Sequence, residues 1–345
     1  MANQIAHQLD GNAASGPSNN QQDAIEVDIE TNREDSDSTF GDGQSETTSL
    51  SSSILAHTYE NGRRYHAYKD GKYLSPNDEQ ESDRLDILHH IYLMQLNGEL
   101  HLAPLGEDFS GRVLELGSGT GIWAIDMGDK YPSATIQAID LSPTQADWVP
   151  PNVFFEIDDM EETWTFSRPF DYIHGKFLAG SIRDWPKLMA QSFDNLKEGG
   201  WVEFQDYDYA PRLPNGQVDE SENWVTKWHK IMMGTCEGKT GASASPGPLL
   251  KKLVTEAGFE DVKEFVYQIP VGTWPKDPKL KEIGRYYKAS LDDGLDGISL
   301  RILTHFLGYT LEEASVLNAH FRTAMKEINF YHLFYVVYGR KPRTK

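Results

Sequence analysis

The sequence has 345 residues, a formal net charge of −21 and a single cysteine, Cys236. The acidic balance argues against a general nucleic-acid-binding surface, which would be basic, and one cysteine excludes an intramolecular disulfide and a cysteine-rich zinc site. The first residues lack a signal peptide's basic and apolar segments, and no apolar run reaches the ~18 residues of a membrane span. We therefore expect a protein of the cytoplasm, the nucleus or both, not a secreted one.

The first residues differ in composition from the rest of the chain. Residues 1–50 hold ten Asp and Glu against one basic residue, Arg33, so their net charge of −9 leaves −12 for residues 51–345. Few of them are apolar, so the segment cannot bury enough surface to offset the entropy of ordering it. We predict a disordered acidic tail over 1–53 and one folded domain over 54–345.

A helix and two turns are predicted directly after the tail. The turn signals are Asn61-Gly62 and Asp70-Gly71. From Asp78 to Leu96 the apolar residues recur at helical spacing, and Gly98 is expected to end this helix. We interpret residues 54–110 as an N-terminal lid with helices.

Strands then alternate with helices over the rest of the chain. The predicted strands are 113–116, 135–140, 153–158, 170–174, 201–206, 261–269 and 331–339. Predicted helices begin near Gly121 and at Pro186, the latter running to Gly199-Gly200, and a third lies near 248–257. This alternation predicts an α/β fold with a mostly parallel sheet covered on both faces. Because such sheets bind ligands at the carboxyl ends of their strands, functional residues should follow the strands.

The glycine-rich run 113–123, VLELGSGTGIW, predicts a strand, a loop and a helix start. Its glycines let the backbone approach a ligand closely, and free amides at the helix start add polar contacts. A dinucleotide-binding loop needs a third glycine where Ile122 stands, so a nicotinamide-dependent dehydrogenase is the weaker alternative. The carboxylate of Glu115 can accept from an ammonium group, which S-adenosylmethionine has and a nicotinamide dinucleotide lacks.

Three further polar positions follow predicted strands. Asp140 lies 21 residues beyond Gly119, where an acidic residue can hold ribose hydroxyls; its alternative is a solvated turn. One carboxylate of the Asp158-Asp159 pair can accept from an adenine amino group, unless the pair only belongs to a surface acidic turn. His174 ends the fourth predicted strand, where a transferred methyl group should sit, although a lone histidine is often structural.

Several of these segments resemble the LaeA-like methyltransferases of filamentous fungi. The similarity covers roughly residues 57–345 and includes YHAYKDGKYLSPNDEQESDRLD, ELGSGTGIWAIDMGDKYPSA, IDLSP, WVPPN, FDYIHGKFLAGSIRDWPKL and LKEGGWVEFQD. The resemblance implies a Rossmann-like class I methyltransferase fold with a mostly parallel seven-stranded sheet and helical insertions over the active site. It further implies a cofactor-binding core over 111–206, and substrate-cover helices with the last two strands over 207–345.

The resemblance also implies which residues bind S-adenosylmethionine. Glu115 should face its amino group, Asp140 its ribose, and Asp159 with the Met160 amide its adenine. Tyr65, Tyr68 and Tyr73 either form part of a lid over the methionine end or only pack the N-terminal segment. The predicted cofactor-binding set is Glu115, Gly117, Ser118, Gly119, Asp140, Leu141, Asp159, Met160, His174, Tyr65 and Tyr73. Ser118 stands where the family often has threonine.

Family members either methylate intermediates of secondary metabolism or regulate it in the nucleus with velvet-domain proteins. We expect the first role, with a small-molecule acceptor, and keep the second as the alternative. If a base is used, His174 is the first candidate and His66 the second. His89 and His90 lie within a helical pattern and are interpreted as structural, and no ligand spacing suggests a metal site.

Two long insertions carry aromatic residues that either line an acceptor pocket or form a core of their own. They span residues 207–247 and 270–328. The residues concerned are Trp224, Trp228, Met232, Met233, Trp274, Tyr286, Tyr287, His305, Phe306 and Tyr309.

Overall fold

The computed structural model describes residues 57–66, 74–145 and 148–344, all of which belong to one compact unit. The predicted tail, Tyr68 and Tyr73 lie outside the described residues. Among the helices that are described, none has the length and apolar character needed to cross a membrane.

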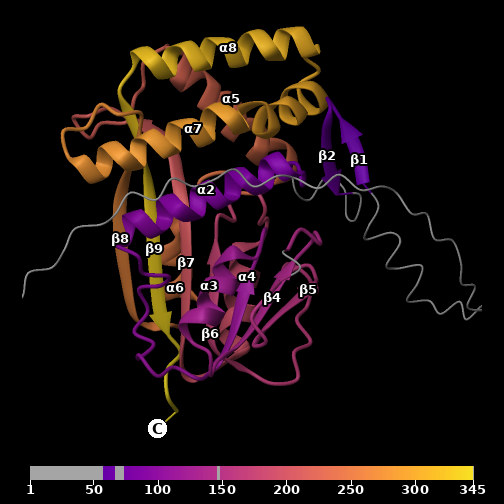
Figure 1. The fold of residues 1–345 in the computed structure, drawn as a ribbon, viewed down its shortest axis with the longest axis vertical. Coiled ribbons are helices and arrows are strands. Elements are labelled where there is room, and N and C mark those ends of the chain that lie inside the picture. Colours follow the sequence, from indigo (N-terminus) through magenta and orange to yellow (C-terminus); the bar gives the residue numbers. More distant parts are fainter. Residues whose placement is uncertain (1–56, 67–73, 146–147, 345) are drawn as a thin grey trace, which may run out of the picture. The chain divides into compact units, whose positions relative to one another are not determined.

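A seven-stranded sheet forms the centre of the fold, in the order β5-β4-β3-β6-β7-β9-β8 (Figure 1). Strands β3 to β7 pair in parallel, whereas β9 runs antiparallel to both of its neighbours. The mostly parallel, seven-stranded α/β fold is thus confirmed. The strands are β3 (Arg112–Leu116), β4 (Thr135–Asp140), β5 (Val153–Ile157), β6 (Phe170–Lys176), β7 (Leu196–Arg212), β8 (Glu260–Val271) and β9 (Phe330–Arg340).

Helices cover both faces of this sheet. On one face, α4 (Trp185–Asp194) and α6 (Leu250–Glu256) bury apolar residues against Leu114 and Leu116 of β3. On the other, α2 (Glu79–Gln95) and α3 (Ile122–Lys130) pack with Val113. The alternation of Val113 and Leu114 between the two cores follows from the period-2 geometry of a strand.

Three helices from the predicted insertions, with α2, cross one end of the sheet (Figure 1). They are α5 (Trp224–Thr240), α7 (Pro278–Arg301) and α8 (Leu311–Glu327). A π-helical turn (Ile302–Phe306) continues α7, and a 3₁₀ turn (Gly247–Leu249) precedes α6. A separate two-stranded hairpin consists of β1 (His57–Glu60) and β2 (Arg63–His66), joined at the predicted Asn61-Gly62 turn.

Several predicted boundaries are wrong, including both ends of the fifth strand, which was predicted over 201–206 and spans Leu196–Arg212. Strand β6 continues to Lys176, two residues beyond His174. Helix α4 ends at Asp194, because the carbonyl of Asn195 accepts from the Phe170 amide at 2.8 Å and turns the chain into the sheet. The predicted stop at Gly199-Gly200 therefore lies inside β7.

Helix α7 contacts the segment after β8 at Gly284. The Gly272 amide donates to the Gly284 carbonyl at 2.9 Å, and a Cβ on Gly284 would lie 2.1 Å from the Gly272 carbonyl oxygen. Because the obstructing atom is backbone, we expect Gly284→Ala to lower the free energy of unfolding by about 1–3 kcal/mol in denaturant titration. In the control, Gly234→Ala in α5, no atom lies within 4 Å of the added Cβ, so stability should be unchanged or higher. Equal destabilisation by both variants would contradict this packing.

Candidate active site

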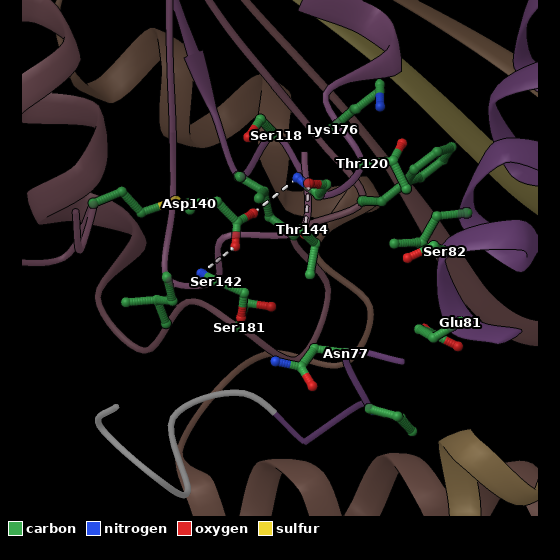
Figure 2. Close-up of a pocket in the computed structure, with 18 of the residues that line it drawn as sticks. Asn77, Glu81, Ser82, Ser118, Thr120, Asp140, Ser142, Thr144, Lys176 and Ser181 are labelled. Atoms are coloured by element: carbon green, nitrogen blue, oxygen red, sulfur yellow. Dashed lines mark hydrogen bonds between the residues drawn. The ribbon is translucent and has the colours of Figure 1, made fainter. Parts of the chain in front are cut away.

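A first cavity lies at the carboxyl ends of β3, β4 and β6, beside helix α2 (Figure 2). Its walls combine the glycine loop, the residues after these strands and the first turns of α2. The lining residues are Pro76, Asn77, Glu81, Ser82, Leu85, Gly117, Ser118, Gly119, Thr120, Ile122, Asp140, Leu141, Ser142, Thr144, Asp159, Met160, Glu161, Lys176, Phe177, Leu178, Ser181 and Ile182. The structure therefore brings together Gly117, Ser118, Gly119, Asp140, Leu141, Asp159 and Met160 of the predicted set.

The glycine loop is fixed to the neighbouring strand by its own backbone. The amides of Gly117 and Ser118 both donate to the Ile139 carbonyl, at 2.9 and 3.1 Å. Gly117 has φ +71°, and a Cβ there would lie 2.7 Å from a Leu178 methyl carbon. Only glycine fits this conformation in this space, so the backbone at position 117 forms the cavity wall directly.

Asp140 connects the loop to the turn that follows β4. Its two carboxylate oxygens accept from the Gly119 amide at 2.8 Å and the Ser142 amide at 2.9 Å (Figure 2). Burial raises the pKa of Asp140, while these amide hydrogen bonds oppose the shift. Asp140 is partly exposed and lines the first cavity, and each oxygen keeps acceptor capacity there.

Asp159 and Met160 form the wall beyond β5. Asp159 is buried, and its Oδ1 accepts from the Glu161 amide at 2.9 Å. The Met160 side chain lies against the glycine loop, 3.2 Å from where a Cβ on Gly117 would stand. Asp159 is thus a carboxylate held in place by backbone at the cavity surface.

Glu115 is fully buried in β3 beneath the loop and is not among the residues that line either cavity. Neither of its carboxylate oxygens has a hydrogen-bond partner within the described chain. Burial raises its pKa to about 8, Asp140 adds to the rise, and the Lys176 ammonium opposes it. A buried carboxylate without donors is costly, so this position fits a group that receives a cationic ligand.

The structure does not place His174 where a methyl group would be transferred. It lies inside β6, is fully buried, and its ring stacks on Trp123 with centroids 3.8 Å apart. Burial holds its pKa well below the usual value. Because β6 runs on, Lys176 rather than His174 lines the cavity at the strand end.

His66 and Tyr65 of β2 also lie outside the residues that line the first cavity. His66 is buried with Nδ1 3.4 Å from the Ser142 hydroxyl. Tyr65 is buried, and the Arg301 guanidinium lies 4.6 Å from its ring centroid. This geometry favours the packing alternative for Tyr65.

A second, largely apolar cavity adjoins the first, since Leu85 and Phe177 line both. Phe177 follows β6 with φ +55°, a conformation uncommon outside glycine and often found at functional sites. The other lining residues are Leu74, Ser75, Arg84, Leu88, Ala179, Gly180, Tyr209, Trp228, His229, Met232, Met233, Cys236, Ala244, Tyr287, Leu291, Ile298, Ile302 and His332.

Two histidines stand in this apolar wall, with ring centroids 4.8 Å apart. His229 Nδ1 lies 2.8 Å from the Val225 carbonyl. A carbonyl only accepts, so Nδ1 carries the proton and Nε2 keeps a lone pair. His332 Nδ1 lies 2.9 Å from the Tyr287 hydroxyl. Burial lowers the pKa of His229 to about 4 and that of His332 well below its usual value, so both rings are neutral near pH 7.

The predicted aromatic insertions divide between the two alternatives. Trp228, Met232, Met233 and Tyr287 line the second cavity. Six others line neither of the two cavities: Trp224, Trp274, Tyr286, His305, Phe306 and Tyr309.

Several lining residues were not predicted from the sequence. Lys176 was not predicted because the fourth strand was expected to end at His174. In the longer strand, side chains alternate between the two sheet faces, so Tyr172, His174 and Lys176 lie on the same face. His229 and His332 carry no motif, and only the tertiary fold brings α5 and β9 together. Within the described residues, no group of three or more His, Cys, Asp or Glu side chains is arranged to hold a metal.

Comparison with known proteins identifies close relatives. A family model described as a methyltransferase domain matches residues 68–264. Methyltransferase pytC of Aspergillus terreus is 42% identical over 92% of this chain and 96% of that protein. Secondary metabolism regulator LAE1 of Cochliobolus heterostrophus is 34% identical over 82% of this chain and 94% of that protein. Protein-methionine methyltransferase laeA of Emericella nidulans is 32% identical over 82% of this chain and 76% of that protein.

Proposed function

Because the chain belongs to the LaeA-like family of S-adenosylmethionine-dependent methyltransferases, we propose that it methylates an apolar small molecule of secondary metabolism, bound in the second cavity. The observation that carries this proposal is the junction of the two cavities at Leu85 and Phe177. The aromatic and aliphatic lining with few polar groups is typical of small-molecule sites. The 42% identity to methyltransferase pytC supports an enzyme rather than a regulator.

The first cavity suits S-adenosylmethionine in its chemistry. Glu115 offers an unpartnered carboxylate to the ammonium group, and Asp140 offers acceptors to the ribose. Asp159 with the Met160 amide is assigned to adenine. When bound, S-adenosylmethionine supplies a methyl group already activated by its sulfonium.

The chain's own residues then align the acceptor and exclude water. Alignment alone can lower the barrier by ~7–11 kcal/mol. Nε2 of His229 is the base we assign, since its lone pair is available and it accepts the proton that an acceptor hydroxyl or amine loses on methylation. Because the His229 pKa is lowered to about 4, this base stays neutral well below pH 6.5.

Metabolite comparison tests the proposed function. A strain lacking the gene should accumulate a compound one methyl group lighter than a product of the parent strain. Purified protein with S-adenosylmethionine should convert the first compound into the second. If the deletion changes only the abundance of many compounds and no substrate is converted, the small-molecule proposal is wrong.

Asp140 provides a prediction about the ribose. Asp140→Asn keeps the size and one acceptor, so it should weaken S-adenosylhomocysteine binding less than Asp140→Ala does. Each hydrogen bond to a charged group contributes roughly 1.5–3 kcal/mol, so the alanine variant should lose about tenfold or more in calorimetric titration. Wild-type affinity in Asp140→Ala would show that the ribose is held elsewhere.

A second function is favoured by one relative named as a secondary metabolism regulator and by another named as a protein-methionine methyltransferase. In this alternative the chain acts in the nucleus with a velvet-domain partner and methylates a protein or itself. Affinity purification of the tagged full-length chain, together with its localisation in living cells, distinguishes the two. Recovery of a velvet-domain protein from nuclei would favour the regulator.

A further inference from the structure

Lys176 is a buried cation that the proposed function has not yet used. It ends β6, is only 7% exposed, and lines the first cavity. Its ammonium lies 5.3 Å from the Phe177 ring centroid. Across the described part of the chain, no hydrogen-bond acceptor or ion-pair partner reaches this ammonium. In Figure 2, Lys176 and Thr120 lie toward one end of the drawn pocket and Asn77 toward the other.

Burial lowers the pKa of Lys176, and three carboxylates oppose that shift, Glu115 most strongly, followed by Asp86 and Asp126. Asp86 accepts from the Thr120 hydroxyl at 2.7 Å, and Asp126 pairs with His89 at 2.9 Å. Both of those carboxylates are therefore engaged. Glu115 alone of the three has two unpartnered oxygens.

Strand register explains why Glu115 and Lys176 share a site. Glu115 of β3 lies opposite His174 of β6, and Lys176 is two residues further along β6. Directly paired residues and residues two positions apart point to the same sheet face. The two opposite charges thus stand diagonally on one face at the strand ends, close to each other without a hydrogen bond between them.

We propose that Lys176 binds the α-carboxylate of S-adenosylmethionine while Glu115 binds its α-ammonium. The methionine end of this ligand is a zwitterion, and Glu115 and Lys176 present the complementary pair of charges. At a pH where Glu115 is ionised, binding exchanges one loose protein pair for two ion pairs with the zwitterionic end of the ligand. The inference rests on the cofactor assignment of the first cavity.

Removal of Lys176 would leave the ligand carboxylate in a buried site without a cation, which is costly. The charge, rather than the side-chain bulk, should therefore control affinity. Lys176→Met keeps length and apolar bulk but removes the charge. Lys176→Arg keeps the charge and serves as the matched control.

Calorimetric titration with two probes tests this assignment. The probes are S-adenosylhomocysteine and its decarboxylated analogue, which keeps the amine. Wild-type protein should bind S-adenosylhomocysteine at least tenfold more tightly than the analogue. Lys176→Met should bind both probes alike, with the loss confined to S-adenosylhomocysteine, and Lys176→Arg should recover part of the preference.

Other outcomes overturn the proposal in distinguishable ways. If Lys176→Met keeps the wild-type preference, or loses affinity equally for both probes, Lys176 does not bind the carboxylate. If wild-type protein binds neither probe, the cofactor assignment of the cavity itself is wrong. Melting temperatures of all variants, measured without ligand, show whether each one is folded.

Discussion

Replacement of Glu115 by glutamine is expected to weaken S-adenosylmethionine binding about 30-fold or more. The substitution keeps size and one acceptor but removes the negative charge that faces the ligand's ammonium. Truncating one partner of a buried, hydrogen-bonded charge pair costs about 2–5 kcal/mol, and each 1.4 kcal/mol is a factor of ten. Titration calorimetry measures this loss, and an unchanged dissociation constant would remove Glu115 from the site.

Glu203→Gln is the matched control, because Glu203 is also a fully buried glutamate on a sheet strand. Its carboxylate accepts from the Leu102 and Ala103 amides, whereas neither Glu115 oxygen has a hydrogen-bond partner in the described chain. The control should lower stability and leave cofactor affinity unchanged. Equal affinity losses in both variants would indicate a general structural effect.

The raised pKa of Glu115 adds a second readout. Without ligand, its carboxyl is largely protonated below pH 8, and binding an ammonium requires the ionised form. Wild-type affinity should therefore rise between pH 6 and pH 8 relative to that of Glu115→Gln. Because the ligand's own α-amine loses its proton at about pH 8, the rise is measured below that pH. A ratio that does not change with pH would contradict the assignment.

His229→Gln is expected to slow turnover about 10²-fold, the lower end of the contribution of a positioned general base, because a pKa of about 4 makes His229 a weak base. Cofactor affinity should not change, because His229 lines only the second cavity. The measurement is kcat with the acceptor identified by metabolite comparison. In wild type, kcat should not fall until the pH drops through the lowered His229 pKa of about 4, or until the protein unfolds.

The matched control for this variant is His320→Gln. His320 is exposed on α8, where its ring stacks on Trp224 with centroids 4.3 Å apart. Turnover within a few-fold of wild type is expected there. If His229→Gln also keeps its turnover within a few-fold of wild type, His229 is not the base.

The sheet was predictable because its determinants are local. Short apolar runs bounded by glycine and proline define the strands, and the spacing of Gly117, Gly119 and Gly121 defines the loop. The carboxyl ends of parallel strands meet at one edge, so the positions of Asp140 and of the Asp158-Asp159 pair after predicted strands placed them at one edge of the sheet. Only the family resemblance selected Asp159, which lines the first cavity together with Asp140. The hairpin pairing of β1 with β2 was not foreseen beyond its turn.

The acceptor side was less predictable, because it is assembled from segments far apart in the chain. Nothing near His229 in the sequence indicates that His332 stands beside it. Trp224 and Trp228 are one turn apart on the same side of α5, yet only Trp228 lines the second cavity. Trp224 is the first residue of the helix, and its ring stacks on His320 of α8 instead. His174 was predicted to be a catalytic residue because it was expected to end the fourth strand. Strand β6 is two residues longer, so Lys176 stands at its end instead.

Transfer of a labelled methyl group tests the central claim most directly. Purified protein would be incubated with methyl-labelled S-adenosylmethionine and an extract of the deletion strain. Wild type would be compared with Met232→Trp, which narrows the second cavity. We predict that label appears in a small molecule with wild type, and that the variant loses this transfer while keeping cofactor affinity. If wild type and Met232→Trp both transfer the label only to proteins of the extract or to themselves, and in equal amounts, the account is contradicted.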